Sequence, residues 1–311
     1  MRVSVVIPTF NRLADLRRVV MAVERQELPA DRELEIVVVD DGSDDGTAGW
    51  LRRRSRGDSF KVLEQPNSGP ARARNRGVEA ATGEIALFLG DDTEPQPGWL
   101  LAHLEEHRLF AREGPLAVLG YTGFPPQEDS PFLAWINEYG AQFGYQLIEN
   151  PCDVPFNFFY TSNISIERSL LLRLGGFRED FPAAAWEDIE LAYRATREGL
   201  AIRYQPRART VHHHRVQPRT FCRRQRTSGR SAAIFARLHP DLEEFLGVGR
   251  VRGRNRQKRL RRCLLATLVS LGERLEGFVP AAVYREYLDL CYLDGKGLAS
   301  PVSGGQRCER Y

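Results

Sequence analysis

The fold of this chain is indicated most clearly by the stretch Glu84-Ile85-Ala86-Leu87-Phe88-Leu89-Gly90-Asp91-Asp92-Thr93-Glu94-Pro95. Its apolar residues 85–89 predict a strand that is buried on both faces, as in a sheet covered by helices. Asp91 and Asp92 follow directly and therefore lie at the carboxyl end of the strand, where open α/β sheets bind ligands. Two such carboxylates suit Mg²⁺ or Mn²⁺, although a turn that caps the next helix explains them equally well.

Other predicted strands surround this stretch and alternate with helices. β-forming residues occur at 2–7, 34–39 and 60–63, and a helix is predicted over 71–81 after a turn that contains Gly and Pro. Strands and helices that alternate at this spacing indicate βαβ units around a parallel sheet. The predicted fold class is therefore α/β.

Three of these strands end on polar or turn-forming residues, namely Pro8-Thr9, Asp40-Asp41 and Asp91-Asp92. Because the carboxyl ends of parallel strands gather at one edge, these residues are placed to bind the base and ribose of a nucleotide. The sequence has no GxGxxG and no Walker lysine motif. The phosphates of a bound nucleotide would then depend on a metal ion.

The composition is that of an ordinary globular protein, with 42% hydrophobic and 27% charged residues in 311. The five cysteines include no CxxC pair, so we expect no disulfide framework and no zinc site. The N-terminus reaches Pro8 too soon for a signal peptide, and no stretch approaches the roughly 20 apolar residues of a membrane span. We expect a cytoplasmic protein, either free or peripheral at the inner face of the membrane.

Positive charge is concentrated in one part of the sequence. The net charge is +3, but residues 203–262 contain 18 Lys and Arg against three acids, which gives +15 there and −12 elsewhere. This asymmetry predicts an acidic catalytic half and a basic half that faces an anionic partner.

Four sequence blocks, at 5–12, 38–45, 67–77 and 88–92, together resemble family 2 glycosyltransferases in order and spacing. The resemblance covers residues 1 to about 215. It implies a Rossmann-like A-type glycosyltransferase domain with a mixed, mostly parallel sheet. It also implies a nucleotide-diphosphate sugar donor, with a UDP-sugar as first choice, a Mn²⁺ or Mg²⁺ cofactor, and inversion at the anomeric carbon.

The same resemblance assigns residues to the donor and to the metal. The metal motif of the family usually contains Asp-x-Asp, but here its first position is Gly90, so Asp92 matches the metal ligand and Asp91 the variable middle. One carboxylate and the donor diphosphate can together hold an ion that keeps some of its waters. The residues expected at the donor nucleotide are Pro8, Thr9, Asn11, Arg12, Asp40, Asp41, Asn67, Arg74 and Asp91.

A helix that begins near Trp186 carries the candidate catalytic acids. Acidic residues in a first helical turn complement the helix dipole, but this explains one acid better than three among four residues. Inverting transfer needs a carboxylate that takes the proton of the acceptor hydroxyl. By its match to the acidic motif of the family, Asp188 is the general base, and Glu187 orients the acceptor or tunes Asp188.

Three histidines, His212 to His214, follow a strand predicted over 203–211. Side chains alternate along an extended chain, so one ion can bind one of them or two separated by one. The resemblance implies that a histidine here completes the metal shell or touches the donor phosphates. His212 is the first choice and His214 the second.

Aromatic residues are frequent in 114–160, where most rings are expected in the core and some in an acceptor cleft. Residues 124–153 carry few regular signals and are compatible with a mobile loop. The expected acceptor is a saccharide or a lipid-linked saccharide, as in the synthesis of a cell-envelope polysaccharide.

The C-terminal part is predicted to be helical and basic. Residues 250–262 are almost purely charged, and leucines at helical spacing follow from Leu260. This pattern suits an element attracted to anionic lipid, at about 1 kcal/mol per basic residue. A pair of helices packed on the catalytic domain explains it equally well. Nucleic-acid-binding signatures are missing, so no nucleic-acid partner is expected.

The predicted organisation is a catalytic domain at 1–215, a basic helical region at 216–294 and a flexible tail at 295–311. Within the domain, 1–112 would bind the nucleotide and 113–215 the acceptor. Two alternatives stay open. A sugar-phosphate nucleotidyltransferase would need a glycine- and lysine-rich phosphate loop near the N-terminus, and residues 8–14 offer only Arg12. A non-catalytic nucleotide-sugar-binding or membrane-docking module is motivated by Gly90 and the basic tail.

Overall fold

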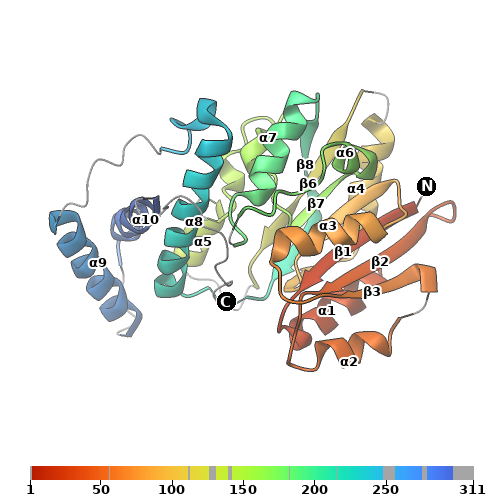
Figure 1. The fold of residues 1–311 in the computed structure, drawn as a ribbon, viewed down its shortest axis with the longest axis horizontal. Helices are drawn as coiled ribbons and strands as arrows, with labels where there is room; N and C mark the ends of the chain where they lie inside the picture. The colour runs from red at the N-terminus through yellow and green to blue at the C-terminus, as the bar shows by residue number, and fades with distance from the viewer. Residues whose placement is uncertain are drawn as a thin grey trace. The chain divides into compact units, whose positions relative to one another are not determined.

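A computed structural model shows two compact units in this chain (Figure 1). The first unit contains Met1–Glu179 and Asp188–His214, and the second contains Asp180–Glu187 and Arg215–Tyr311. The residues that the structure describes are 2–55, 57–110, 113–125, 131–138, 142–181, 183–214, 216–247, 256–274 and 279–296.

The first unit is built on one sheet, in which eight strands are described, in the order β3-β2-β1-β4-β7-β6-β8-β5. Neighbouring strands are parallel from β3 to β4 and between β6 and β8, and the other pairs are antiparallel. The predicted mixed, mostly parallel α/β sheet is thus confirmed. The strands are β1 (Arg2–Thr9), β2 (Glu33–Asp40), β3 (Phe60–Glu64), β4 (Ile85–Leu89), β5 (Thr93–Pro95), β6 (Leu116–Gly123), β7 (Asn163–Glu167) and β8 (Ala201–His212).

Helices cover both faces of this sheet, because its central strands are apolar on both sides. Val6 and Val37 face a core formed with α3, α6 and α7, whereas Val5 and Val38 face a core formed with α1, α2 and α4. All five residues of β4 are buried, as their unbroken apolar run predicted. The helices are α1 (Leu13–Glu24), α2 (Thr47–Arg52), α3 (Pro70–Ala80), α4 (Trp99–Phe110), α6 (Arg168–Arg173) and α7 (Glu187–Arg197).

A buried polar network joins α4 to β7. Asn163 Oδ1 accepts hydrogen bonds from Trp99 Nε1 (2.7 Å) and His103 Nε2 (2.9 Å). His103 Nδ1 then accepts a hydrogen bond from the Ser165 hydroxyl (2.9 Å), and His107 Nε2 donates a hydrogen bond to the oxygen of that hydroxyl (2.9 Å). In this arrangement His103 is neutral, because its Nδ1 accepts a hydrogen bond. Burial lowers the pKa of His103 to about 4 and that of His107 to about 3, which favours the neutral form of both rings.

Three elements of the first unit were not predicted from the sequence. β6 fills the sheet between β7 and β8, and β5 exists as three residues paired with β8. α5 (Pro131–Glu138) makes the expected loop over 124–153 wrong for these residues, because Phe132, Leu133 and Ile136 are buried. Residues 126–130 and 139–141 of that loop lie outside the described residues. Short 3₁₀ turns occur at η1 (Gly57–Ser59), η3 (Tyr145–Leu147) and η4 (Phe156–Phe158).

The second unit contains the predicted C-terminal helices α8 (Pro218–Leu238), α9 (Arg256–Arg274) and α10 (Ala281–Lys296), with a short turn η5 (Pro240–Leu242). α8 and α10 pack so closely that their contact needs glycine on both helices. A Cβ atom at Gly229 would collide with the Tyr292 carbonyl oxygen, and one at Gly295 would collide with that of Arg226. Among the described helices, none is long and apolar enough to cross a bilayer. The tail predicted over 295–311 begins too early, because Gly295 and Lys296 are the buried last residues of α10. Residues 297–311 lie outside the described residues.

Candidate active site

The carboxyl ends of β1, β2 and β4 meet at one edge of the sheet. Thr9, which ends β1, pairs with Asp40, which ends β2. The Thr9 hydroxyl also donates a hydrogen bond to Asp91 Oδ2 (2.8 Å), just beyond β4. Pro8 lies one residue earlier in β1, opposite Val39. The structure therefore brings together the three strand ends at which the sequence predicted a nucleotide site.

The neighbours Asp40 and Asp41 differ in how far their oxygens are already used. Asp40 is buried and accepts a hydrogen bond from Ser43 N (3.0 Å) at one oxygen. Asp41 holds the turn before α3 through both of its oxygens, which accept from Gln65 Nε2 (2.6 Å), Ser68 N (2.8 Å) and Gly69 N (2.9 Å). Burial raises the pKa of Asp41, and these donors oppose the rise. Asp40 is thus better suited to a nucleotide, and Asp41 to loop structure.

Two further residues predicted at the donor belong to loops around this edge. Asn11 has a positive φ of 54°, its side-chain oxygen accepts from Asp44 N (2.8 Å), and its own N–H donates to Ser43 Oγ (2.9 Å). It therefore joins the loop after β1 to the loop after β2. Asn67 is exposed in the turn before α3.

Arg12 binds the carboxylate pair that follows β4. Its Nη1 atom contacts Asp92 Oδ2 and lies 3.4 Å from Asp91 Oδ1. Burial and the adjacent charge of Asp92 raise the pKa of Asp91. Burial acts in the same direction on Asp92, but His212 and Arg12 outweigh it and lower the pKa of that carboxyl. The two acids are thus unequal, and Asp92 carries the negative charge more readily.

The strand pairing of β5 with β8 brings a histidine to Asp92. Thr93 lies opposite His212 in this ladder. His213 points elsewhere, since its Nε2 lies 2.7 Å from Glu94 Oε2. The rings of His212 and His214 are 6.0 Å apart. This alternation agrees with the expectation that only His212 and His214 could share one ion.

Asp92 and His212 fit part of a metal site. His212 Nε2 lies 3.5 Å from Asp92 Oδ1, and both side chains are buried. A carboxylate with an imidazole suits Mn²⁺ better than Mg²⁺, which prefers oxygen ligands. Within the described part of the chain, no three acidic, histidine or cysteine side chains cluster as a metal site would require. An ion at Asp92 would therefore need further ligands, such as diphosphate oxygens and water.

The glycine that replaces the first acid of the metal motif is fixed by its surroundings. A Cβ atom at Gly90 would lie 2.6 Å from Thr93 Oγ1 and 3.1 Å from Asp92 Oδ1. Thr93 is fully buried, and its hydroxyl lies 3.2 Å from the same Asp92 oxygen. A side chain at this position would therefore displace the Thr93 hydroxyl and crowd Asp92.

Asp188 lies partly buried near the start of α7. Its Oδ2 accepts long hydrogen bonds from Thr161 N (3.3 Å) and Thr161 Oγ1 (3.4 Å), and its Oδ1 accepts from Ile189 N (2.9 Å). Burial raises the pKa of Asp188, and the positive charge of Arg74 lowers it in part. The Arg74 guanidinium lies 5.5 Å from the centre of the Phe177 ring. Arg74, which was predicted at the donor nucleotide, therefore acts electrostatically on the candidate base.

The other two acids of this helix are both buried. Glu187 begins α7. Glu190 pairs with Arg194 (3.0 Å), whose guanidinium donates to the carbonyl oxygens of Leu174 and Gly176 (2.7 Å each). Glu190 thus fixes the turn after α6, which explains the third acid structurally.

The sequence did not connect Tyr160 or Thr161 with the base. Tyr160 is partly buried, its hydroxyl donates to the Phe143 carbonyl oxygen, and burial together with the charge of Asp188 raises its pKa. The two residues precede β7 and reach Asp188 only through the fold. The aromatic pattern of the sequence pointed to this region but not to a particular ring.

Comparison with known proteins identifies the family. The family model described as Glycosyl transferase family 2 matches residues 4–168, which is more than half of the 311 residues. The chain therefore belongs to glycosyl transferase family 2, and its fold is the A-type fold that the sequence resemblance implied.

One relative is the pre-mycofactocin glycosyltransferase of Mycobacterium tuberculosis, 32% identical over 249 residues that cover 77% of this chain and 48% of the relative. The chain thus spans about half the length of the curated relatives it matches. A similar solved structure is mannosyltransferase PcManGT from Pyrobaculum calidifontis with GDP-Man and Mn²⁺ (TM-score 0.61, 21% identity, 95% of this chain and 86% of that one). Another is S. aureus TarS 1–349 with UDP-GlcNAc (TM-score 0.51, 19% identity, 96% and 91%).

Proposed function

We propose that this chain transfers a sugar from a nucleotide-diphosphate donor to an acceptor hydroxyl in a single displacement that inverts the anomeric carbon. The observation that carries the proposal is the carboxylate of Asp188, which burial makes more basic and which two hydrogen bonds from Thr161 orient. A base that accepts a proton from a hydroxyl works best when its pKa is raised toward the operating pH.

The donor site of this proposal is the edge formed by Thr9, Asp40 and Asp91. Asp40 has a carboxylate oxygen suited to the base or ribose of the nucleotide, and Thr9 and Asp91 are joined by a buried hydrogen bond beside it. Because solved neighbours carry UDP-GlcNAc or GDP-Man, we propose a UDP-sugar donor as first choice.

A divalent cation held by Asp92 and His212 would stabilise the negative charge of the leaving nucleoside diphosphate. Arg12 now binds Asp92, so it would have to yield part of this contact when the ion and donor enter. It would then remain close enough to meet the donor phosphates. His214 is the second choice of imidazole ligand, and Mn²⁺ the first choice of ion.

In the transfer itself, Asp188 takes the proton of the attacking hydroxyl and Arg74 limits how far the pKa of this base rises. We assign Glu187 a supporting role, in which it orients the acceptor or tunes Asp188. The acceptor class that we propose is a saccharide, free or lipid-linked.

The test is an incubation of the full chain with Mn²⁺, several nucleotide sugars and a panel of saccharide acceptors. We expect one donor to raise the melting temperature in the presence of Mn²⁺, since a ligand that binds the folded state stabilises it. With that donor, an α-linked sugar should give a β-linked product in NMR spectra. Retained configuration would contradict the single displacement. In a parallel incubation with added pyrophosphate, formation of a nucleoside triphosphate together with a sugar 1-phosphate would favour nucleotidyl transfer.

A further inference from the structure

Helix α9 exposes an apolar face. Its inward residues Leu265 and Val269 are buried, while four leucines three or four residues apart lie on the opposite side and are exposed. A contiguous apolar surface of this kind marks an interaction site more often than a free surface. The members of this leucine face, with exposed fractions, are Leu260 (58%), Leu264 (66%), Leu268 (52%) and Leu271 (47%).

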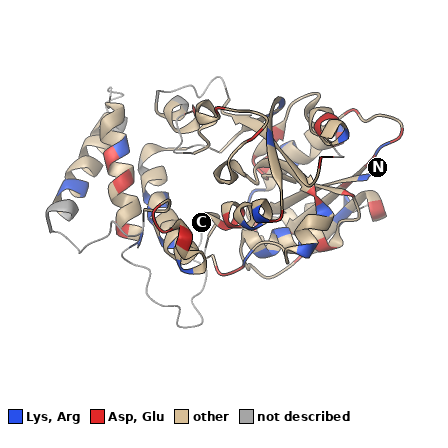
Figure 2. Cartoon of the chain, turned by 90° about the horizontal axis from the view of Figure 1, so that it is seen from above, with Lys and Arg blue, Asp and Glu red and all other residues tan. Residues whose placement is uncertain are grey.

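The sequence around the leucine face is strongly basic. Residues 250–262 contain eight Lys and Arg and no acid. Two of these bind acids of α10: Arg261 contacts Glu286, and Arg262 contacts Asp294. Figure 2 marks both signs of charge along the helices of this unit. The acids of α10 therefore offset only part of the positive charge that adjoins the leucines.

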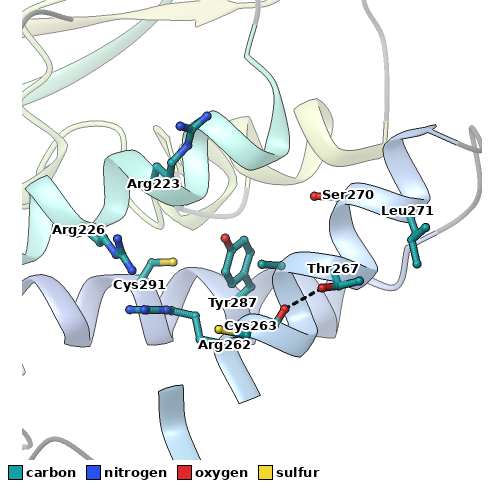
Figure 3. Close-up of a pocket in the computed structure, with 10 residues that line it drawn as sticks. Arg223, Arg226, Arg262, Cys263, Thr267, Ser270, Leu271, Tyr287 and Cys291 are labelled. Atoms are coloured by element: carbon teal, nitrogen blue, oxygen red, sulfur yellow. Dashed lines mark hydrogen bonds between the residues drawn. The ribbon is translucent and has the colours of Figure 1, made fainter. Parts of the chain in front are cut away.

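A cavity of about 500 Å³ lies between α8, α9 and α10 and adds a second basic feature (Figure 3). Arg223 and Arg226 enter its wall from α8, and Arg262 enters from α9. Arg226 Nε lies 3.0 Å from Asp294 Oδ2, the oxygen that Arg262 also contacts. Three guanidinium groups and one carboxylate leave a net positive charge at this wall.

The cavity is not only basic. Ala266, Leu271 and Tyr287 also line it. Leu271 belongs both to this lining and to the leucine face. The basic cavity and the apolar face of α9 are therefore adjacent, which is the combination that a phosphate headgroup with attached acyl chains requires.

We infer that α9 docks this chain on an anionic phospholipid bilayer. The leucine face would lie at the boundary between headgroups and acyl chains, as in interfacial amphipathic helices. The lipid phosphates would neutralise Arg223 and the guanidinium charge at the cavity wall that Asp294 leaves unbalanced. This geometry gives the second unit a binding function that is independent of the sugar donor.

Charge and apolarity together favour a bilayer over two other occupants. A second copy of the chain would bring two sets of basic residues together, and like charges repel. A nucleic acid would pair with the arginines but would leave the four leucines in water. It would therefore forgo the free energy of burying them, about 25 cal/mol per Å² of apolar surface. Of these three occupants, an anionic bilayer matches both features.

Co-sedimentation of the full chain with vesicles tests this inference. We expect binding to vesicles of phosphatidylcholine with phosphatidylglycerol, weaker binding to phosphatidylcholine alone, and a loss of binding in high salt. A double variant, Leu264→Glu with Leu268→Glu, should bind at least about tenfold more weakly, and Arg223→Gln about fivefold more weakly. Both changes are at exposed positions, so circular dichroism should remain that of the wild type.

Matched controls come from the first unit. Leu109 is 59% exposed, and Arg53 is exposed, so Leu109→Glu and Arg53→Gln should leave vesicle binding unchanged. Equal binding by the double variant and the wild type would overturn the inference. The inference would also be overturned if the chain bound inorganic phosphate at the arginines but did not bind anionic vesicles. If the wild type sedimented as a dimer and the double variant as a monomer, the leucine face would be assigned to a second copy instead.

Discussion

At the scale of single residues, Gly90 decides how the metal motif is built. Replacing Gly90 by Ala places a methyl group about where it would meet Thr93 Oγ1 (2.6 Å) and crowd Asp92. We expect a loss of about 1–3 kcal/mol in the free energy of unfolding and Mn²⁺ affinity about tenfold weaker in the presence of nucleoside diphosphate. Isothermal titration with Mn²⁺ measures the second effect. Gly49→Ala is the control, because its Cβ atom would meet only Arg53 Nη1, at 3.8 Å; equal Mn²⁺ affinities would contradict this account.

The pH dependence of activity belongs to the same scale. Since burial raises the pKa of Asp188 and the base must be ionised, kcat/KM should fall with decreasing pH through a pKa above the ordinary aspartate value of 3.8. Arg74→Gln removes the charge that opposes this rise, so the acidic limb should move to higher pH. Arg72→Gln changes an exposed arginine of the same helix and should leave the limb in place. A limb that does not move in Arg74→Gln would separate Arg74 from the base.

At the scale of elements, the docking of α4 on β7 should be sensitive to acid. The pKa values of His103 and His107 lie near 4 and 3 in the folded chain but near 6.5 in the unfolded one. The unfolded chain therefore takes up protons first as the pH falls, and the free energy of unfolding should decline below about pH 6.5. At about pH 5 the loss should be about 2 kcal/mol for each histidine.

Urea unfolding as a function of pH measures this loss. In His107→Gln the amide can still donate to Ser165 Oγ but cannot take up a proton, so its decline below neutral pH should be about half as steep. Identical pH dependence in the wild type and His107→Gln would show that these histidines do not control acid stability.

The pairing of α8 with α10 rests on a glycine contact. Gly229→Ala would force a methyl group into the Tyr292 carbonyl oxygen, although alanine is intrinsically the better helix former. We expect the second unit of Gly229→Ala to unfold at a lower temperature than that of the wild type. The unfolding temperature of the first unit should not change. Calorimetry with a resolved second transition tests this, and an unchanged or raised transition would contradict the close contact.

At the scale of the whole molecule, the sequence predicted what depends on local pattern. The buried run of β4 predicted a helix-covered sheet, and the strand ends at Thr9, Asp40 and Asp91 predicted where side chains would gather. β5 and β6 escaped prediction because they are defined by their partners β8 and β7 rather than by periodicity.

The roles of individual acids were also decided by distant partners. Asp40 and Asp41 are equivalent in the sequence, and only the turn at residues 65–69 makes Asp41 structural. Glu190 lies in the same helix turn as the candidate catalytic acids, but its ion pair with Arg194 gives it a structural role. Part of the basic charge counted over residues 203–262 is likewise neutralised within the first unit, because Arg203 and Arg207 of β8 pair with acids of α4.

The role of Asp188 as the base of an inverting sugar transfer is tested by the steady-state kinetics of Asp188→Asn with its donor and acceptor. Asparagine keeps the size and hydrogen-bond acceptor of the side chain but cannot take the proton, so we expect kcat to fall by about 10²- to 10⁴-fold. Donor affinity, measured by the melting-temperature shift with Mn²⁺, should stay within about twofold of the wild type. Wild-type kcat in Asp188→Asn would contradict the account.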